Sequence, residues 1–337
     1  MGRTTKQNSI TSPELLKQVN PKNTQLLDDF IEYLKSIKRS EGTLKQYRSD
    51  INIAFVWCLQ HNDNKFFVNW SKRNIVAYQN WLMNNNENSP ARVRRLKAAL
   101  SSLSGYIENI LDDEFPDFRN IINKIENPAL RPVREKTVWD DDELEALLDK
   151  LMEQKKFDKA CFVALGMYGG RRKSELCRFK VSDFGDDKLV CNRALYKSDP
   201  ILTKGNKYLP CYTLAKRFKP YLDAWIGYRN EHNIESEWLF PDPADPKSHR
   251  SVDTLNSWAV SLSNVSGRDF YFHSLRHYFV SYLSRSGIPD SVIVSIIGWD
   301  TAEMFNIYND NPKDDQIGMY FANGDISIPT TKGIAEL

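Results

Sequence analysis

The sequence predicts a mainly α-helical protein of two domains, with one small β-sheet in the second domain. The chain has 337 residues, enough for two domains that each bury a core. Apolar residues recur at helical spacing through the first third of the chain and through most of its second half. Between these regions, the stretch KIENPALRPVREKTVW contains two prolines and little periodicity, which is typical of an interdomain linker.

The composition, with 41% apolar and 27% charged residues, is that of a soluble globular protein. No apolar run approaches the roughly 18 residues of a membrane span, and no segment resembles a signal peptide, so we expect no membrane partner. The five cysteines are dispersed, which argues against a zinc cluster or a disulfide framework and favours a reducing cytoplasm. A net charge of +2 is too small to indicate a nucleic-acid partner by itself.

The first domain is predicted to be a helical bundle over residues 24–125, preceded by a flexible arm over residues 1–23 with little apolar content. A linker follows over residues 126–137. The last helical stretch opens with Ser-Pro, a helix-start signal. Four amphipathic stretches with short connections make up the bundle; they begin at Thr24, Thr43, Ser71 and Ser89.

The fourth of these stretches carries a cluster of cations opposite an apolar stripe. No glutamate alternates with these cations, as it would on a salt-bridged surface, and a second cationic pair lies on the second stretch. Such a face can lie in a DNA major groove and neutralise phosphates, although a solvated helix face explains the same pattern. The candidate DNA-binding residues are Lys45, Arg48, Arg92, Arg94, Arg95 and Lys97.

The second domain is predicted over residues 138–337 and is mostly helical. Its first helix begins at Asp140, and Glu143 stands three positions on, at the spacing of a capping box. Strands are predicted only in an insertion around KLVCN and PILTKGNKYLPCY, where Lys-Gly-Asn-Lys forms a turn. Residues 322–337 are predicted to be weakly structured.

Two motifs of this domain combine cations with polar partners. In GMYGGRRKSELCRF, two glycines end one helix directly before Arg171 and Arg172, so an arginine there can point at an anion. Glu175 lies three residues after Arg172 and can orient it, although a surface ion pair explains the same spacing. His273 and Arg276 are one helical turn apart, so both can face one ligand.

Two further residues follow from these motifs. His277 stands four residues after His273, but the metalloprotease pattern requires a glutamate directly after the first histidine, and serine stands there. No third ligand is evident, so a structural role for His277 is favoured over zinc binding. Tyr308 lies nine residues after Trp299, at the end of the helical stretch that His273 opens.

Together these motifs resemble those of the tyrosine recombinases, the phage-integrase family that includes the Cre and Xer types. The family's first box, Thr-Gly-Leu-Arg-x-x-Glu-Leu, is similar to GGRRKSEL here, which places the catalytic arginine at Arg172 and not at Arg171. HSLR matches the His-x-x-Arg box, and the step of nine residues from Trp299 leads to Tyr308. The hairpin lysine of the family matches Lys204 in TKGNKYLP, and Lys197 and Lys207 are weaker matches.

The resemblance covers nearly the whole chain from about residue 24. It implies that the helical bundle is the family's core-binding domain and that the rest is its mixed α/β catalytic domain. It also implies a reaction without cofactor or metal, in which a tyrosine attacks a DNA phosphodiester and forms a 3′-phosphotyrosine. The implied catalytic residues are Tyr308 as nucleophile, Arg172 and Arg276 as phosphate clamps, His273 as base, Lys204 as acid, Trp299 as a packing residue and N–H donor, and Glu175 as the orienting group for Arg172.

The implied substrate is double-stranded DNA carrying recombination sites, bound by a homo-tetramer that is a monomer or weak oligomer without DNA. An accessory directionality factor is a further expected partner, and the segment after Tyr308 is expected to form a small helix that docks on a neighbouring protomer. We expect a bacterial or phage-encoded protein that integrates or excises a mobile element. The alternatives are a type IB topoisomerase, a catalytically silent DNA-binding relative and a metal-dependent nuclease.

Overall fold

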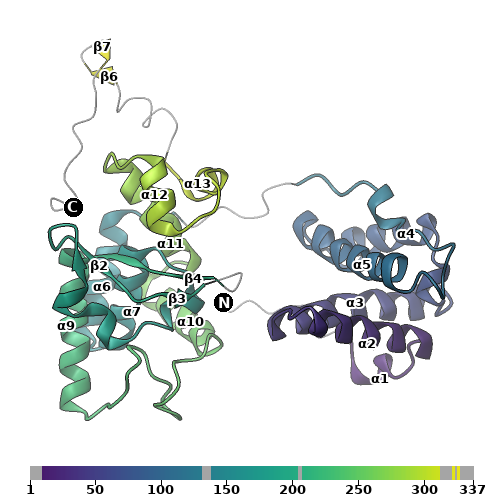
Figure 1. Ribbon diagram of the computed structural model, residues 1–337, viewed down its shortest axis with the longest axis horizontal. Coiled ribbons are helices and arrows are strands. Elements are labelled where there is room, and N and C mark those ends of the chain that lie inside the picture. The colour runs from purple at the N-terminus through teal and green to yellow at the C-terminus, as the bar shows by residue number, and fades with distance from the viewer. Residues whose placement is uncertain (1–9, 131–137, 204–206, 312–320, 323–324, 327–337) are drawn as a thin grey trace. The chain divides into compact units, whose positions relative to one another are not determined.

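A computed structural model describes residues 10–130, 138–203, 207–311, 321–322 and 325–326 (Figure 1). The chain divides into two compact units between residues 135 and 136. Each unit has its own cluster of buried apolar side chains. The predicted fold class, mainly helical with small sheets, is confirmed. No helix in the described part of the chain has the length and apolar character needed to cross a membrane.

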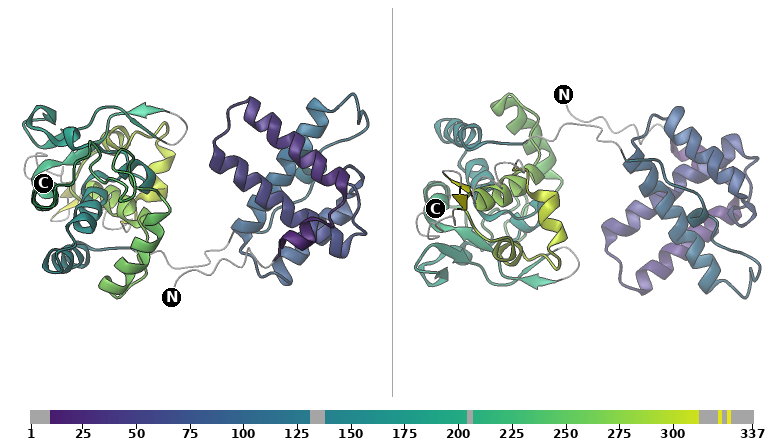
Figure 2. Two further views of the ribbon diagram at one scale, coloured as in Figure 1. Left: turned by 90° about the horizontal axis from the view of Figure 1, so that it is seen from below. Right: turned by 90° about the horizontal axis from the view of Figure 1, so that it is seen from above.

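The first unit is built from four long helices that cross one another (Figure 2). Each begins where a short polar side chain caps the free backbone N–H groups, as in Ser40 and Ser89, and prolines occupy the first position of two of them. The helices and 3₁₀ turns of this unit are α1 Pro13–Leu16, α2 Pro21–Ser36, α3 Glu41–His61, η2 Phe67–Asn69, α4 Lys72–Asn84, α5 Pro90–Ile110 and η3 Ile122–Lys124.

The prediction of a flexible arm over residues 1–23 is wrong for the part of it that the structure describes. Residues Pro13–Leu16 form α1, and Val19 is buried in the core. The backbone N–H of Asn20 donates to the side chain of Asn64 at 2.8 Å, and its own side-chain amide donates to the Asn64 carbonyl at 2.9 Å. These bonds connect the start of α2 to the chain just after α3.

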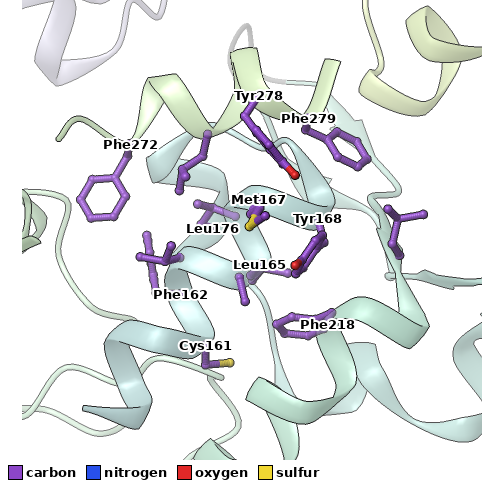
Figure 3. Packing of buried hydrophobic residues seen from close by; sticks show 14 of the residues in the cluster. Cys161, Phe162, Leu165, Met167, Tyr168, Leu176, Phe218, Phe272, Tyr278 and Phe279 are labelled. Carbon is purple, nitrogen blue, oxygen red and sulfur yellow. The ribbon is translucent and has the colours of Figure 1, made fainter. Parts of the chain in front are cut away.

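The second unit is organised around α7, which is buried along most of its length and packs against α9 and α11. Figure 3 shows Leu165 and Tyr168 of α7 between Phe218 of α9 and Tyr278 and Phe279 of α11. The helices and 3₁₀ turns of this unit are α6 Asp141–Glu153, α7 Phe157–Gly169, α8 Lys173–Leu176, η4 Val181–Phe184, η5 Asp186–Lys188, α9 Ala215–Glu231, α10 Thr254–Ser266, α11 His273–Arg285, α12 Asp290–Ile297 and α13 Glu303–Tyr308.

The strands of this unit form small antiparallel sheets in the predicted insertion. One sheet has the order β1-β2-β5, with Leu195 opposite Leu214. β3 and β4 form a separate hairpin, with Ile201 opposite Leu209. Near the end of the chain, β6 pairs with β7, in a region where we expected weak structure. The strands are β1 Leu189–Val190, β2 Leu195–Lys197, β3 Ile201–Leu202, β4 Tyr208–Leu209, β5 Tyr212–Leu214, β6 Phe321–Ala322 and β7 Asp325–Ile326.

Two predictions fall on residues that the structure does not describe. Lys204, the predicted acid, is one of residues 204–206, which follow β3 and precede β4 in the sequence and are outside the described residues. The predicted small helix after Tyr308 falls largely on residues 312–320, which are also outside them.

Candidate active site and DNA-binding residues

The site begins at the tight turn between α7 and α8. Gly170 ends α7 with a φ of 63°, in the left-handed region that favours glycine, and a Cβ there would overlap the ring of Phe279. The next two residues enter different environments, because Arg171 is 1% exposed whereas the Arg172 side chain is 28% exposed. The turn therefore presents Arg172 toward the surface of the unit and Arg171 toward its interior.

Arg172 is held by a glutamate one turn along α8. Its Nη1 lies 3.0 Å from Oε1 of Glu175, and its backbone N–H donates to Oε2 at 3.2 Å. Glu175 is fully buried; burial opposes its ionisation, but the charge and hydrogen bonds of Arg172 outweigh this and hold its pKa below the ordinary value. The contact is the one that the spacing of these two residues predicted.

Arg276 on α11 is fully buried, and part of its hydrogen-bonding capacity is unused within the described residues. Its Nη1 donates to the carbonyl of Gly170 at 3.0 Å, whereas Nε and Nη2 have no hydrogen-bond partner among the described residues. Burial, followed by repulsion from Arg172, lowers the pKa of Arg276 to about 10. A buried guanidinium with unsatisfied donors is unfavourable by itself, and an oxyanion with several acceptor oxygens is the ligand that suits it.

Tyr308, the last residue of α13, lies against this guanidinium. The ring centroid of Tyr308 is 5.3 Å from Cζ of Arg276, within the range of a cation–π contact. Its ring centroid lies 5.2 Å from that of His273 and 5.0 Å from that of Trp299. The structure thus brings together four predicted site residues that are spread over 36 positions, 273 to 308, of the sequence.

Trp299 packs against both the arginine and the tyrosine. Its ring centroid is 5.2 Å from Cζ of Arg276, and its indole N–H is buried without a hydrogen-bond partner in the described ranges. A buried N–H without an acceptor is rare and marks a position where a ligand oxygen can bind. This geometry agrees with the role predicted for Trp299, packing together with one N–H donor.

The residues after Tyr308 are tied to α11 by contacts that sequence reasoning missed. Ser281 Oγ accepts from the backbone N–H of Asp310 at 2.8 Å, and the side-chain amide of Asn311 donates to the Ser281 carbonyl at 3.0 Å. Nδ1 of His277 lies 3.0 Å from a carboxylate oxygen of Asp310, and its ring centroid is 4.7 Å from that of Tyr308. His277 therefore has the structural position favoured for it, and no sequence signal marked Ser281 or Asp310.

Side-chain contacts hold the chain on both sides of residues 204–206, the range that includes Lys204. Arg178 donates to the carbonyl of Leu202 in β3 at 2.8 Å. After the turn, Nζ of Lys207 lies 2.6 and 2.7 Å from the two carboxylate oxygens of Asp300, the residue that follows Trp299. Because Lys207 is paired with a carboxylate, it remains a weaker candidate for the acid than Lys204.

In the first unit, a buried aspartate organises two of the predicted DNA-binding arginines. Asp50 on α3 is 2% exposed and lies 2.7 Å from Nη1 of Arg92 and 3.4 Å from Nε of Arg95, both on α5. The sequence showed only that no glutamate alternates with these cations on their own helix. The partner comes from the neighbouring helix, which a helical-face pattern does not reveal.

The other predicted cations of this unit differ in how far they are engaged within the protein. Lys45 is exposed on α3, and the half-exposed Arg48 lies 2.6 Å from Asp28 on α2. Nε of Arg94 donates to the carbonyl of Pro128 at 2.9 Å. An exposed lysine such as Lys45 can bind a phosphate without losing a contact within the protein. Each arginine would have to bind the phosphate together with its present partner or in place of it.

Lys97 is not a surface cation, which argues against its predicted role as a DNA-binding residue. It is 3% exposed, and its Nζ donates to the side chain of Gln79 at 2.7 Å and to the carbonyls of Ile125 and Glu126 at 3.0 Å. Burial and the charge of Arg94 lower its pKa. Lys97 therefore holds Ile125 and Glu126 against α5. The buried face of α5 is wider than the apolar pattern of the sequence indicated.

Replacing Lys97 with methionine will lower the free energy of unfolding by about 2 kcal/mol, because three acceptors lose a shared charged donor. It will leave the salt dependence of binding to a non-specific DNA duplex unchanged. Replacing the exposed Lys45 with methionine is the matched control and will reduce the slope of log affinity against log salt by about one. Urea unfolding and fluorescence anisotropy measure the two effects. A reduced salt slope for the Lys97 variant would show that this ammonium reaches DNA.

Comparison with known proteins identifies families over most of the chain. Residues 137–314 match the model of the phage integrase family, and residues 26–117 match that of the phage integrase N-terminal SAM-like domain. The SPbeta prophage-derived recombinase-like protein YomM of Bacillus subtilis is 24% identical over 287 residues, which cover 82% of this chain and 84% of YomM.

Two solved structures share the fold. One is the XerH site-specific recombinase bound to a palindromic difH substrate, in a post-cleavage complex. Its TM-score is 0.64 at 17% identity, and the match covers 93% of this chain and 91% of the XerH chain. A lambda integrase tetramer bound to a Holliday junction has a TM-score of 0.63 at 17% identity and covers 87% of this chain and 77% of its own.

The family match includes every described residue of the candidate active site, from the arginine turn at Gly170 to Asn311. The separate match of the helical bundle accounts for the first unit. The chain belongs to the phage integrase family and is a tyrosine recombinase, an enzyme that exchanges DNA strands.

Proposed function

We propose that Tyr308 cuts double-stranded DNA by forming a 3′-phosphotyrosine, and that the enzyme uses this reaction to integrate or excise a mobile element. The observation that carries the proposal is the contact between the Tyr308 ring and the buried guanidinium of Arg276, whose Nε and Nη2 have no partner among the described residues. A nucleophile thus lies beside donors that suit a phosphate, and both are enclosed by His273 and Trp299.

Each residue has a task that follows from its chemistry. Attack on a phosphodiester adds negative charge to the non-bridging oxygens, which Arg276 and Arg172 stabilise with charge-assisted hydrogen bonds. His273 takes the phenol proton, because a phenol with a pKa near 10 is a weak nucleophile while protonated. Lys204 protonates the departing 5′-oxygen. Glu175 acts through Arg172 and keeps it aimed at the phosphate.

The bond balance of this reaction makes it reversible. The Tyr308 oxygen forms a bond to phosphorus while the bond from phosphorus to the 5′-oxygen breaks, so one phosphodiester replaces another. A free 5′-hydroxyl can attack the phosphotyrosine and reseal the strand without an energy source. When that hydroxyl belongs to a second duplex, the strands are exchanged.

Four copies acting on two DNA sites would provide that second duplex. The lambda integrase structure named above is a tetramer on a Holliday junction, and this supports the same assembly here. The prophage origin of YomM supports a mobile-element role. We also propose that an accessory factor sets the direction of the reaction. Lys45, Arg48, Arg92, Arg94 and Arg95 would contact the DNA backbone from the first unit.

The test is covalent capture on a pool of nicked duplexes whose central sequence is randomised. A nick near the cleaved bond releases the short strand that carries the 5′-hydroxyl, so the adduct cannot reseal and persists in denaturant. We expect an adduct to form in the presence of chelator. We also expect the released strand to carry a free 5′-hydroxyl that can be end-labelled. Sequencing of the captured DNA then defines the site. Cleavage that stops in chelator, or an adduct on the 5′-end, would contradict the proposal.

The biological role needs a separate measurement. A plasmid carrying two copies of the captured site in direct repeat is incubated with the enzyme, with and without host extract as a source of accessory factors. Excision of a circle supports the mobile-element role. Relaxation of supercoils without any recombined product would instead indicate a type IB topoisomerase activity.

A further inference from the structure

Arg171, the neighbour of the phosphate-binding arginine, is one of the largest fully buried side chains of the protein. Its Nη1 donates to the carbonyl of Ile297 at 2.9 Å. Its Nη2 donates to the carbonyls of Ile296 at 2.7 Å and Pro210 at 3.2 Å. One guanidinium therefore joins the α7–α8 turn to the end of α12 and to the residue that follows strand β4.

The two isoleucine carbonyls are the last ones of α12, where helix carbonyls have no partner within the helix. The negative end of the helix dipole lies at the same place, so a cation is favoured there. Gly298 then leaves the helix with a φ of 73°, and Trp299 follows directly. Arg171 thus holds the backbone immediately before the tryptophan that packs on Arg276 and Tyr308.

The contact with Pro210 reaches a second part of the site. Pro210 follows Leu209, which pairs with Ile201 at the base of the hairpin that carries Lys204. The same side chain therefore sets the hairpin base and the Trp299 backbone at fixed positions relative to Arg172, its neighbour in the chain.

Stability alone does not account for an arginine at this position. Among the described residues, Arg171 forms no ion pair with a carboxylate, and its Nε is buried without a hydrogen-bond partner. A buried charge that is compensated only by carbonyls is stabilised less well than an apolar side chain of similar size. The corresponding residue of the family's first box is leucine, which would fill the space without this penalty.

We propose that Arg171 is a positioning residue for strand cleavage, which fixes Trp299 and the paired ends of strands β3 and β4 relative to Arg172 and Arg276. The inference rests on the proposed function of this site. Loss of the side chain would let these segments shift, and a displacement of about 1 Å in an active site can slow a reaction on the order of 100-fold.

A matched control exists in the same unit. Arg229 on α9 is 4% exposed and donates to the carbonyls of Trp238 at 2.6 Å, Ser236 at 2.7 Å and Leu239 at 3.0 Å. It is therefore also a buried arginine whose hydrogen bonds are made with carbonyls, but its partners are not active-site segments. Arg229→Leu removes the same group as Arg171→Leu and differs only in which backbone segments it releases.

The experiment measures single-turnover cleavage of the captured site at saturating enzyme, at a temperature well below the unfolding midpoint of every variant. We expect Arg171→Leu to slow cleavage about 100-fold with DNA affinity unchanged. Arg229→Leu will cleave at the wild-type rate. Arg171→Lys, which keeps the charge and loses the forked contact, will fold and cleave at an intermediate rate. Wild-type cleavage by Arg171→Leu, or equal slowing by Arg229→Leu, would overturn the proposal.

Amide hydrogen exchange provides a readout that does not require catalysis. The N–H groups of Trp299 and Cys211 are hydrogen-bonded, and both lie next to segments that Arg171 holds. They will exchange faster in Arg171→Leu and at the wild-type rate in Arg229→Leu. If wild type forms no adduct, the proposed function fails, and exchange still decides whether Arg171 holds these segments. Unchanged exchange in Arg171→Leu would overturn the positioning role.

Discussion

Replacing Tyr308 with phenylalanine will abolish the covalent adduct with DNA while leaving DNA affinity and the unfolding midpoint close to those of wild type. Phenylalanine keeps the ring contacts with His273, Trp299 and Arg276 and removes only the attacking oxygen. No other group can supply the phosphotyrosine bond, so the loss is complete and not partial. Denaturing gels of labelled suicide substrate measure the adduct, and thermal unfolding measures stability.

Tyr228 on α9 provides the control for removal of a phenol oxygen. Its ring stacks on Trp225 and His232, away from the candidate site, so Tyr228→Phe will form the adduct at the wild-type rate. Adduct formation by the Tyr308 variant would assign the nucleophile to another residue. A Tyr308→Phe variant that neither unfolds normally nor binds DNA would show that the phenol oxygen has a structural role, because phenylalanine keeps the ring.

Replacing Arg276 with methionine will slow strand cleavage about 1000-fold, because the transition state loses a buried guanidinium. The same change will leave the unfolding midpoint no lower than that of wild type. In the chain without DNA, this arginine is fully buried with Nε and Nη2 unpaired among the described residues. Burial already disfavours its charge and lowers its pKa to about 10, so an apolar side chain of similar length relieves a penalty.

Opposite effects on rate and stability are the signature of a residue kept for function. Single-turnover cleavage and calorimetry measure the two quantities in parallel. Arg276→Lys is the companion variant: it keeps a charge but cannot clamp two phosphate oxygens, so cleavage will recover only in part. Methionine at this position with near wild-type cleavage would show that Arg276 does not contact the phosphate.

The same two arginines show what the sequence could predict about the site. The spacing of the first motif distinguishes Arg172 from Arg171, and the structure places Arg172 beside Glu175 and Arg171 in the interior. The step of nine residues from Trp299 to Tyr308 likewise selects one tyrosine of fifteen, and the structure encloses it with His273 and Arg276. These choices follow the register of the family's motifs, and the structure brings the chosen residues together, while their roles in the reaction stay predictions.

Local sequence patterns did not predict several of the tertiary contacts. Lys97 has the spacing of a surface cation but is buried under the segment around Ile125, and Asp50 reaches its arginines from another helix. Nothing in the sequence indicated the hydrogen bonds between Asn20 and Asn64.

The sequence by itself determined the helical fold class, the family resemblance and the identity of the candidate catalytic residues. These depend on local periodicity, caps and motif spacing, which are properties of neighbouring residues. Only the tertiary structure decided that Lys97 is internal and that Arg171 joins the arginine turn to Ile297 and Pro210. These contacts connect positions up to 126 residues apart, and their formation depends on how whole helices and strands pack.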